Sequence, residues 1–329
     1  MLTLLAIATL AQGQDPVVPI ARPGIDGRGR DPWVFRGIFE DRTRMVLIAP
    51  RANWWMAFNP ETGAMHKVWQ GKMDFRGKVW DFSQDNSRAE GKIYFAAPSE
   101  IWRFPDTSEQ SKGYIAVDLT FDKGAWQFTS ARSQLSTPPL DLTDWHRIFV
   151  AFDETGKKGR FRVDVSGTQP QWFTSATSVG GENEWQWNFK RIERPEKDTV
   201  IKITTQSAGK KIRNLRMYGD KGAWFDSKGR HLDVLWDGYT LLDRTRAVDI
   251  RIQLRLASGK LVKVSMAPDL RYNSWFETYT ISDLPKGESV VLKREGLSPS
   301  IKSNLKQGSF VFDRNGTQEL NFEIQEAGK

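Results

Sequence analysis

A strict alternation of apolar and polar side chains between Ala247 and Ala257 constrains the fold of this chain most strongly. Side chains of a β-strand point alternately to two faces, so a period of two predicts a strand with one buried and one solvated face. Ser258-Gly259-Lys260 then turns the chain into a second apolar run, Leu261–Met266. The pattern predicts an antiparallel hairpin, because antiparallel sheets commonly leave one face in water.

Short runs of this kind recur along the chain, and no amphipathic helix longer than three turns is evident, so we predict an all-β fold. Tyr114–Phe121 alternates throughout and is expected to be one strand. Pro32–Phe39 fits either a strand or a short helix with Asp31 as cap and Pro32 at its first position. Gly63 closes a turn after Asn59 and is expected at positive φ. Further strands are expected at Met45–Ala49, Trp54–Asn59, Ala64–Trp69, Phe75–Trp80, Gly91–Ala97, Trp126–Thr129, His146–Phe152, Arg160–Val165, Glu184–Phe189, Thr199–Thr204, Ile212–Tyr218 and four segments after Trp275.

The first thirteen residues form an apolar run that ends in small residues, although a positively charged start is missing. Such a run is typical of an export signal and is too short to span a bilayer as a helix. We therefore expect residues 1–13 to be a signal peptide, the mature chain to be periplasmic or extracellular, and no membrane span. Residues 14–30 are rich in Pro, Gly and Arg without apolar periodicity and are expected to be a linker.

Composition excludes several function classes. The formal charge is +8, but the basic residues are scattered and no nucleic-acid-binding module is recognisable, so no nucleic-acid partner is expected. The chain has no cysteine, which excludes disulfides, thiolate metal sites and covalent haem attachment. Its three histidines, His66, His146 and His231, are far apart in sequence, so neither a metal nor a cofactor is expected.

Two segments resemble known modules. Pro32–Arg36, Arg44–Val46 and Trp55–Trp80, with Lys67-Val68-Trp69, Gly71, Phe75 and Gly77, resemble an uncharacterised β-rich module of large secreted bacterial proteins. Those proteins often also carry c-type cytochrome or pyrroloquinoline-quinone sugar-dehydrogenase-like domains. The resemblance therefore implies an extracytoplasmic accessory module near redox or carbohydrate chemistry, with a carbohydrate or a secreted redox protein as partner. It resumes from Gly222 to Gly287, and Trp145–Gly167 with Ile212–Gly219 resembles laminin-G- or concanavalin-like sandwiches.

These resemblances imply a split antiparallel β-domain with an inserted jelly-roll-like β-sandwich. A polar, turn-rich stretch at 98–113 marks the boundary, and about seven short strands follow it, as in sandwiches. We assign residues 31–97 and 222–329 to the split domain and residues 98–221 to the insertion. Within the split domain Trp55, Trp69, Phe75 and Trp80 are expected to pack internally.

The candidate binding residues are four tryptophans of the insertion, Trp126, Trp172, Trp185 and Trp187, which lie in or near its loops. Such a ring can stack on a sugar, whereas the alternative for each tryptophan is core packing. Trp172 follows Gln169-Pro170-Gln171 and is the best candidate for an exposed ring.

No residue is assigned a catalytic role. Glycosidases need two carboxyl groups across the scissile bond, and Glu182 and Glu184 beside Trp185 and Trp187 are the candidate pair. Alternation on a strand would separate Glu184 from the tryptophan rings. Asp118, Asp153 and Asp164 could bind calcium, but no local calcium loop occurs.

The sequence therefore favours a secreted, non-catalytic binding or accessory module for a polysaccharide, an oligosaccharide or a redox protein. A carbohydrate-active hydrolase or lyase and a structural envelope protein are the alternatives.

Overall fold

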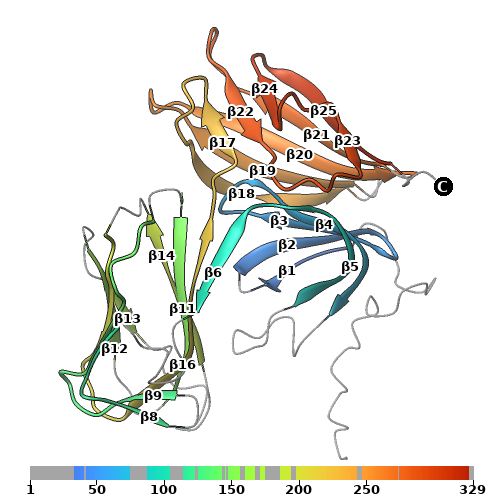
Figure 1. Cartoon of the computed structure of the whole chain (residues 1–329). Coiled ribbons are helices and arrows are strands. Elements are labelled where there is room, and N and C mark those ends of the chain that lie inside the picture. Colours follow the sequence, from blue (N-terminus) through green and yellow to red (C-terminus); the bar gives the residue numbers. More distant parts are fainter. Residues whose placement is uncertain are drawn as a thin grey trace, which may run out of the picture.

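Strands make up all the regular structure of the described part of the chain. The computed structural model describes residues 33–40, 42–74, 87–103, 114–122, 125–142, 145, 147–155, 160–166, 171–174, 186–193, 198–242, 247–272 and 274–325. No helix occurs in these ranges, and every pair of neighbouring strands in the sheets is antiparallel. The all-β prediction is confirmed. Figure 1 shows a lobe of green and yellow strands beside a second lobe that contains both the blue and the orange-to-red strands.

The first sheet is a five-stranded meander in sequence order. Its strands are β1 (Trp33–Phe39), β2 (Arg42–Arg51), β3 (Trp54–Asn59), β4 (Ala64–Asp74) and β5 (Arg88–Ala96). The segment that fitted either a strand or a helix is thus the strand β1. The strand expected at Phe75–Trp80 lies outside the described residues.

The continuous apolar run in β2 has a simple explanation, because this strand is buried on both faces. Val46 and Ile48 belong to one hydrophobic cluster, whereas Met45, Leu47 and Ala49 belong to another on the opposite face. Trp55 and Trp69 lie in that second cluster, stacked with ring centroids 6.0 Å apart. Their expected packing role is confirmed, and Phe75 and Trp80 lie outside the described residues.

The green and yellow lobe is a sandwich of two sheets. The "β12 sheet" has the order β13-β12-β15-β10-β7, and the "β11 sheet" has the order β14-β11-β16-β9-β8, with β6 also paired to β16. The bounds are β6 (Ser99–Arg103), β7 (Ile115–Val117), β8 (Leu119–Asp122), β9 (Ala125–Phe128), β10 (Gln134–Ser136), β11 (Arg147–Thr155), β12 (Arg160–Val165), β13 (Gln171–Thr174), β14 (Gln186–Glu193), β15 (Ile201–Thr205) and β16 (Lys210–Asp220). Side chains from both sheets, including Phe152 and Phe161, form its core.

The prediction of one strand over Tyr114–Phe121 was wrong. Asp118 has a φ of 51° and divides this segment into β7 in one sheet and β8 in the other. Its carbonyl accepts hydrogen bonds from the Thr129 backbone N–H and from the hydroxyls of Thr129 and Ser133. Aspartate tolerates this left-handed conformation better than most residues, and alternation alone does not reveal such a break.

The remaining strands form two further sheets. A three-stranded sheet has the order β17-β22-β24, and a six-stranded sheet has the order β18-β19-β20-β21-β25-β23. The bounds are β17 (Trp224–Asp226), β18 (Asp233–Leu242), β19 (Ala247–Arg255), β20 (Leu261–Arg271), β21 (Ser274–Ser282), β22 (Val290–Lys293), β23 (Ile301–Ser303), β24 (Ser309–Phe312) and β25 (Gly316–Ile324). The predicted hairpin of residues 247–266 is the β19–β20 pair.

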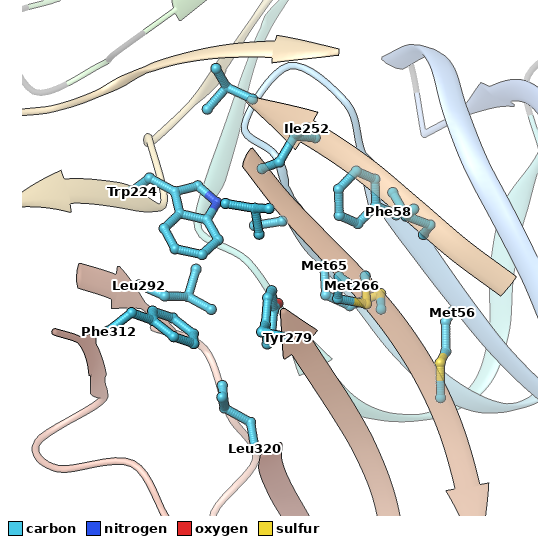
Figure 2. Packing of buried hydrophobic residues seen from close by; sticks show 14 of the residues in the cluster. Met56, Phe58, Met65, Trp224, Ile252, Met266, Tyr279, Leu292, Phe312 and Leu320 are labelled. Carbon is cyan, nitrogen blue, oxygen red and sulfur yellow. The ribbon is translucent and has the colours of Figure 1, made fainter. Parts of the chain in front are cut away.

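One hydrophobic cluster joins the first sheet to the last two sheets. Figure 2 shows Met56, Phe58 and Met65 from β3 and β4 close to Ile252 and Met266 from β19 and β20, with Trp224 and Tyr279 beside them. The chain segments before and after the sandwich therefore share one core. The chain passes between the lobes at Ala97-Pro98 and again after Asp220.

Candidate functional site

The three described tryptophans of the predicted set, Trp126, Trp172 and Trp187, do not lie on one surface. Trp126 is 7% exposed and packs in the sandwich core, with its ring centroid 4.9 Å from that of Phe121, so it presents little surface to a ligand. Trp172 lies in β13 opposite Arg162, and Trp187 lies in β14 opposite Asp153. Trp185 lies outside the described residues, as do Glu182 and Glu184.

Strand register places Trp172 and Trp187 on opposite sides of the sandwich. In β12 Phe161 and Val163 are buried in the core, so Arg162 and its partner position Trp172 share the face turned away from the core. In β11 Phe152 is buried, which places Trp187, opposite Asp153, on the outer face of the other sheet. Two separate surfaces thus carry the two candidate positions.

The outer face of the β12 sheet has an unbroken row of positions across all five of its strands. The register pairs Trp172 with Arg162, Arg162 with Thr204, Thr204 with Gln134, and Gln134 with Val117. A neighbouring row consists of Asp164, Lys202, Ser136 and Ile115. We call these nine positions the β12 outer face.

The β12 outer face combines polar side chains with exposed apolar ones. Arg162 Nε donates to Asp164 Oδ1 at 2.6 Å, and Gln134 Nε2 donates to Ser136 Oγ at 2.9 Å. Ser136 itself is 3% exposed, so it is covered and does not offer its hydroxyl to a ligand. At the edge strand β7, Ile115 is 56% exposed and Val117 is 43% exposed. Guanidinium, carboxylate and amide groups can hydrogen-bond neighbouring hydroxyls, and apolar groups can contact the C–H face of a sugar. The surface is chemically suited to a flat, hydroxyl-rich ligand.

The three candidate calcium ligands, Asp118, Asp153 and Asp164, are hydrogen-bonded to other side chains or lie on the opposite sheet. Asp164 is paired with Arg162, and Asp118 Oδ2 accepts from the Ser130 hydroxyl at 2.9 Å. Asp153 is in β11 of the opposite sheet. No group of three or more potential metal ligands occurs within the ranges that the structure describes.

A cavity of about 110 Å³ between the lobes is a second candidate site, which the sequence did not predict. We call it the junction cavity. Its walls come from the β3–β4 turn, the start of β4, both chain crossings and the end of β22; they include His66, Asp220, His231, Lys293, Arg294 and Glu295. These residues are far apart in sequence, so no local motif could have predicted the cavity.

A buried ion pair anchors the sandwich beside this cavity. Arg42 Nε donates to Asp220 Oδ1 at 2.8 Å, and Asn59 Nδ2 donates to Asp220 Oδ2 at 2.9 Å. Arg42 is 2% exposed and Asp220 is 3% exposed. Both carboxylate oxygens are therefore occupied by donors of the other lobe, which fixes the last residue of β16 on the first sheet.

The two described histidines at the cavity are held neutral. Burial, and then the charges of Arg42 and Lys67, hold the pKa of His66 well below its usual value. Burial and the nearby Lys293 ammonium also lower the pKa of His231. The charges near both imidazoles are cationic, so they disfavour protonation of either ring.

Comparisons with known proteins add structural neighbours. No protein-family model matches the sequence, and no curated protein matches it. The C-terminal CBM6 of a marine laminarinase from Zobellia galactanivorans aligns with a TM-score of 0.30 and 13% identity, covering 37% of this chain and 100% of that chain. A CBM35 from Paenibacillus barcinonensis aligns with a TM-score of 0.28 and 14% identity, covering 36% and 97%. A family 35 carbohydrate-binding module from Clostridium thermocellum aligns with a TM-score of 0.28 and 14% identity, covering 37% and 98%.

The resemblance to modules of cytochrome- and dehydrogenase-bearing secreted proteins stays a prediction after these comparisons. In the part of the chain described by the structure, no helix is long and apolar enough to cross a membrane.

Proposed function

We propose that this chain is a non-catalytic carbohydrate-binding protein whose sandwich holds a polysaccharide or oligosaccharide on the β12 outer face. The observation that carries the proposal is the row from Trp172 to Val117, which brings an aromatic position, a guanidinium, an amide and an exposed apolar edge together on one solvent-facing sheet surface.

The chemistry of this face matches the two-sided character of a sugar ring. A pyranose presents C–H groups on its faces and hydroxyls around its rim. The ring of Trp172 would stack on the C–H face, because aromatic side chains contribute large contact areas at low conformational cost. Arg162, Asp164 and Gln134 would hydrogen-bond the hydroxyls, and the Arg162–Asp164 pair is already formed at 2.6 Å. A preformed pair reduces the ordering cost of binding.

The sheet surface favours a glycan chain over a single enclosed sugar. Its row of positions crosses five strands that lie roughly 4.8 Å apart, so it extends for about 19 Å. That length matches several sugar units. We propose that the ligand is a neutral or weakly charged polysaccharide, because Arg162 is already balanced by Asp164.

A location outside the cytoplasm is part of the same proposal. It depends on the apolar run at residues 1–13, which lies outside the described residues. Extracellular or periplasmic polysaccharides would then be the accessible ligands.

Affinity electrophoresis on a panel of soluble polysaccharides tests the proposal. Wild-type protein should be retarded by at least one glycan, and Trp172→Ala should weaken the interaction at least about tenfold, since truncating an aromatic side chain that anchors a ligand often costs about 2 kcal/mol or more. Trp187→Ala is the matched control, because its position lies on the opposite outer face, and it should bind as the wild type does. Retardation by no glycan, or a loss confined to Trp187→Ala, would refute the proposal.

A further inference from the structure

The junction cavity contains polar groups that fold stability alone does not explain. His66 is 3% exposed and lines the cavity, and no hydrogen bond to its imidazole is found among the described residues. A buried polar group normally has a partner, because an unpaired one carries a desolvation cost. A neutral imidazole offers one donor and one acceptor.

Arg294 provides a second unmatched group on the cavity wall. Its side chain is buried, and one terminal nitrogen donates to Glu277 and, at 2.7 Å, to the Tyr279 hydroxyl. The Nε of Arg294 is buried and has no acceptor within the described part of the chain. This nitrogen has almost no accessible surface, so a ligand in the cavity does not reach it, and Arg294 contributes a buried charge to the wall.

Lining cations without an ion pair favour an anion in the cavity. Arg42 is paired with Asp220 and Lys67 with Glu40, whereas no ion pair of Lys221 or Lys293, which both line the cavity, is found among the described residues. The exposed ammonium of Lys293 lies 4.1 Å from the centre of the Phe225 ring at the margin. The carboxylate of Asp220 is neutralised by Arg42 and accepts from Asn59.

One lining carboxylate opposes this balance. Glu295 is exposed, and no ion pair between its carboxylate and a cation is found among the described residues. Its charge should weaken the attraction for an anion, which makes Glu295 a useful probe of the sign of the field.

Size and apolar lining restrict the anion to a small organic one. A single water needs about 10–15 Å³ of such volume, so the cavity of about 110 Å³ accommodates a group of several heavy atoms. Ala64, Phe95, Ala97 and Pro98 contribute apolar wall, and carboxylates with a short carbon part would contact both kinds of surface.

We propose that the junction cavity is a binding site for a small carboxylate, which is hydrogen-bonded by His66 and attracted by Lys221 and Lys293. Two sources share this chemistry: a free short-chain acid, and the carboxylate of a uronic acid unit. The site is separate from the β12 outer face and does not depend on glycan binding there.

Isothermal titration of the full chain with acetate, propionate and glucuronate, with glucose as the neutral control, tests the proposal. Saturable binding of at least one acid and none of glucose is expected. Acetate has only four heavy atoms, and the ceiling on affinity per atom limits its Kd to about 10⁻⁵ M or weaker. Binding of acetate or propionate indicates a free acid as ligand, whereas binding of glucuronate alone indicates a uronic acid unit.

Substitutions of Lys293 and Glu295 at the cavity margin form a matched pair. Both residues are exposed, so replacing either should affect folding little. Glu295→Gln should tighten binding and Lys293→Gln should weaken it, each by about two- to fivefold for a solvent-screened charge. His66→Asn should weaken binding about tenfold, and thermal unfolding checks that this variant is folded. Trp172→Ala should leave acid binding unchanged, which separates this result from that of the glycan assay.

No saturable heat with any acid up to about 50 mM would overturn the proposal, because a site this polar should be occupied below that concentration. The proposal would also be overturned if Glu295→Gln and Lys293→Gln changed the Kd of the acid by the same factor in the same direction.

Discussion

Replacing Gly63 by alanine tests how the two halves of the split lobe pack. Gly63 lies in the turn between β3 and β4 with a φ of 65°, as the sequence predicted. A Cβ atom there would lie 2.7 Å from both Ile252 Cδ1 and Val234 Cγ1 and 3.3 Å from Trp224 Nε1. The Gly63 carbonyl also accepts a hydrogen bond from Trp224 Nε1 at 2.8 Å. The turn is therefore wedged against β17, β18 and β19.

The expected loss of stability has two parts. A left-handed conformation costs an alanine about 1–2 kcal/mol. Forcing a methyl group into a filled core costs about 1–3 kcal/mol more. Gly63→Ala should therefore lower the free energy of unfolding by about 2–5 kcal/mol. Gly229→Ala is the matched control, since Gly229 has a φ of 77° but no atom within 4 Å of its Cβ position, and it should lose the conformational part alone.

Urea unfolding followed by tryptophan fluorescence measures both variants, because Trp224 is 1% exposed in the native state. The packing account predicts a larger loss for Gly63→Ala by at least about 1 kcal/mol. Equal losses in the two variants would show that the turn is not wedged into the core, and would refute the close contact between the β3–β4 turn and the later strands.

Two further predictions concern the junction between the lobes. Asp220→Asn removes the carboxylate that pairs with the buried Arg42 charge and should cost about 3–5 kcal/mol of stability in urea unfolding. The control Glu90→Gln breaks an exposed pair with Lys72 and should cost at most about 1 kcal/mol. Similar costs for the two variants would contradict the anchoring role of Asp220. The pKa of His66 is lower in the folded chain than in the unfolded chain, so the unfolded chain binds a proton more readily. The contribution of the neutral His66 imidazole to stability is therefore full above pH 6.5, the usual pKa, and declines as the pH falls below that value. His66→Asn should flatten that decline, measured as unfolding free energy between about pH 7 and 5, by up to about 1.4 kcal/mol per pH unit; an unchanged slope would contradict a neutral buried imidazole.

The local pattern was sufficient to predict most strands. Alternation in residues 247–257 identified β19, and the turn at Ser258-Gly259-Lys260 fixed its partner β20. The run at Met45–Ala49 was correctly predicted as a buried strand, although its burial on two faces depends on contacts with distant segments. The switch of sheets at Asp118 escaped prediction because it depends on hydrogen bonds to residues more than ten positions away.

The candidate site could be predicted in part. The position of Trp172 on an outer face follows from register, which requires knowing that Arg162 is its partner. Trp126 has the same residue type and a similar sequence context but lies in the core, and only the pairing of strands distinguishes the two. The junction cavity could not be predicted, because His66, Asp220 and Arg294 meet only after the lobes are assembled.

A methyl-NMR titration with a retained oligosaccharide tests the central claim most directly. Ile115 and Val117 lie on the β12 outer face and are 56% and 43% exposed, whereas Ile93 and Val311 are 44% and 52% exposed in the other lobe. If glycans bind the β12 outer face, the methyl signals of Ile115 and Val117 should shift and those of Ile93 and Val311 should not. Shifts confined to Ile93 or Val311, or no shifts at saturating glycan, would contradict the claim.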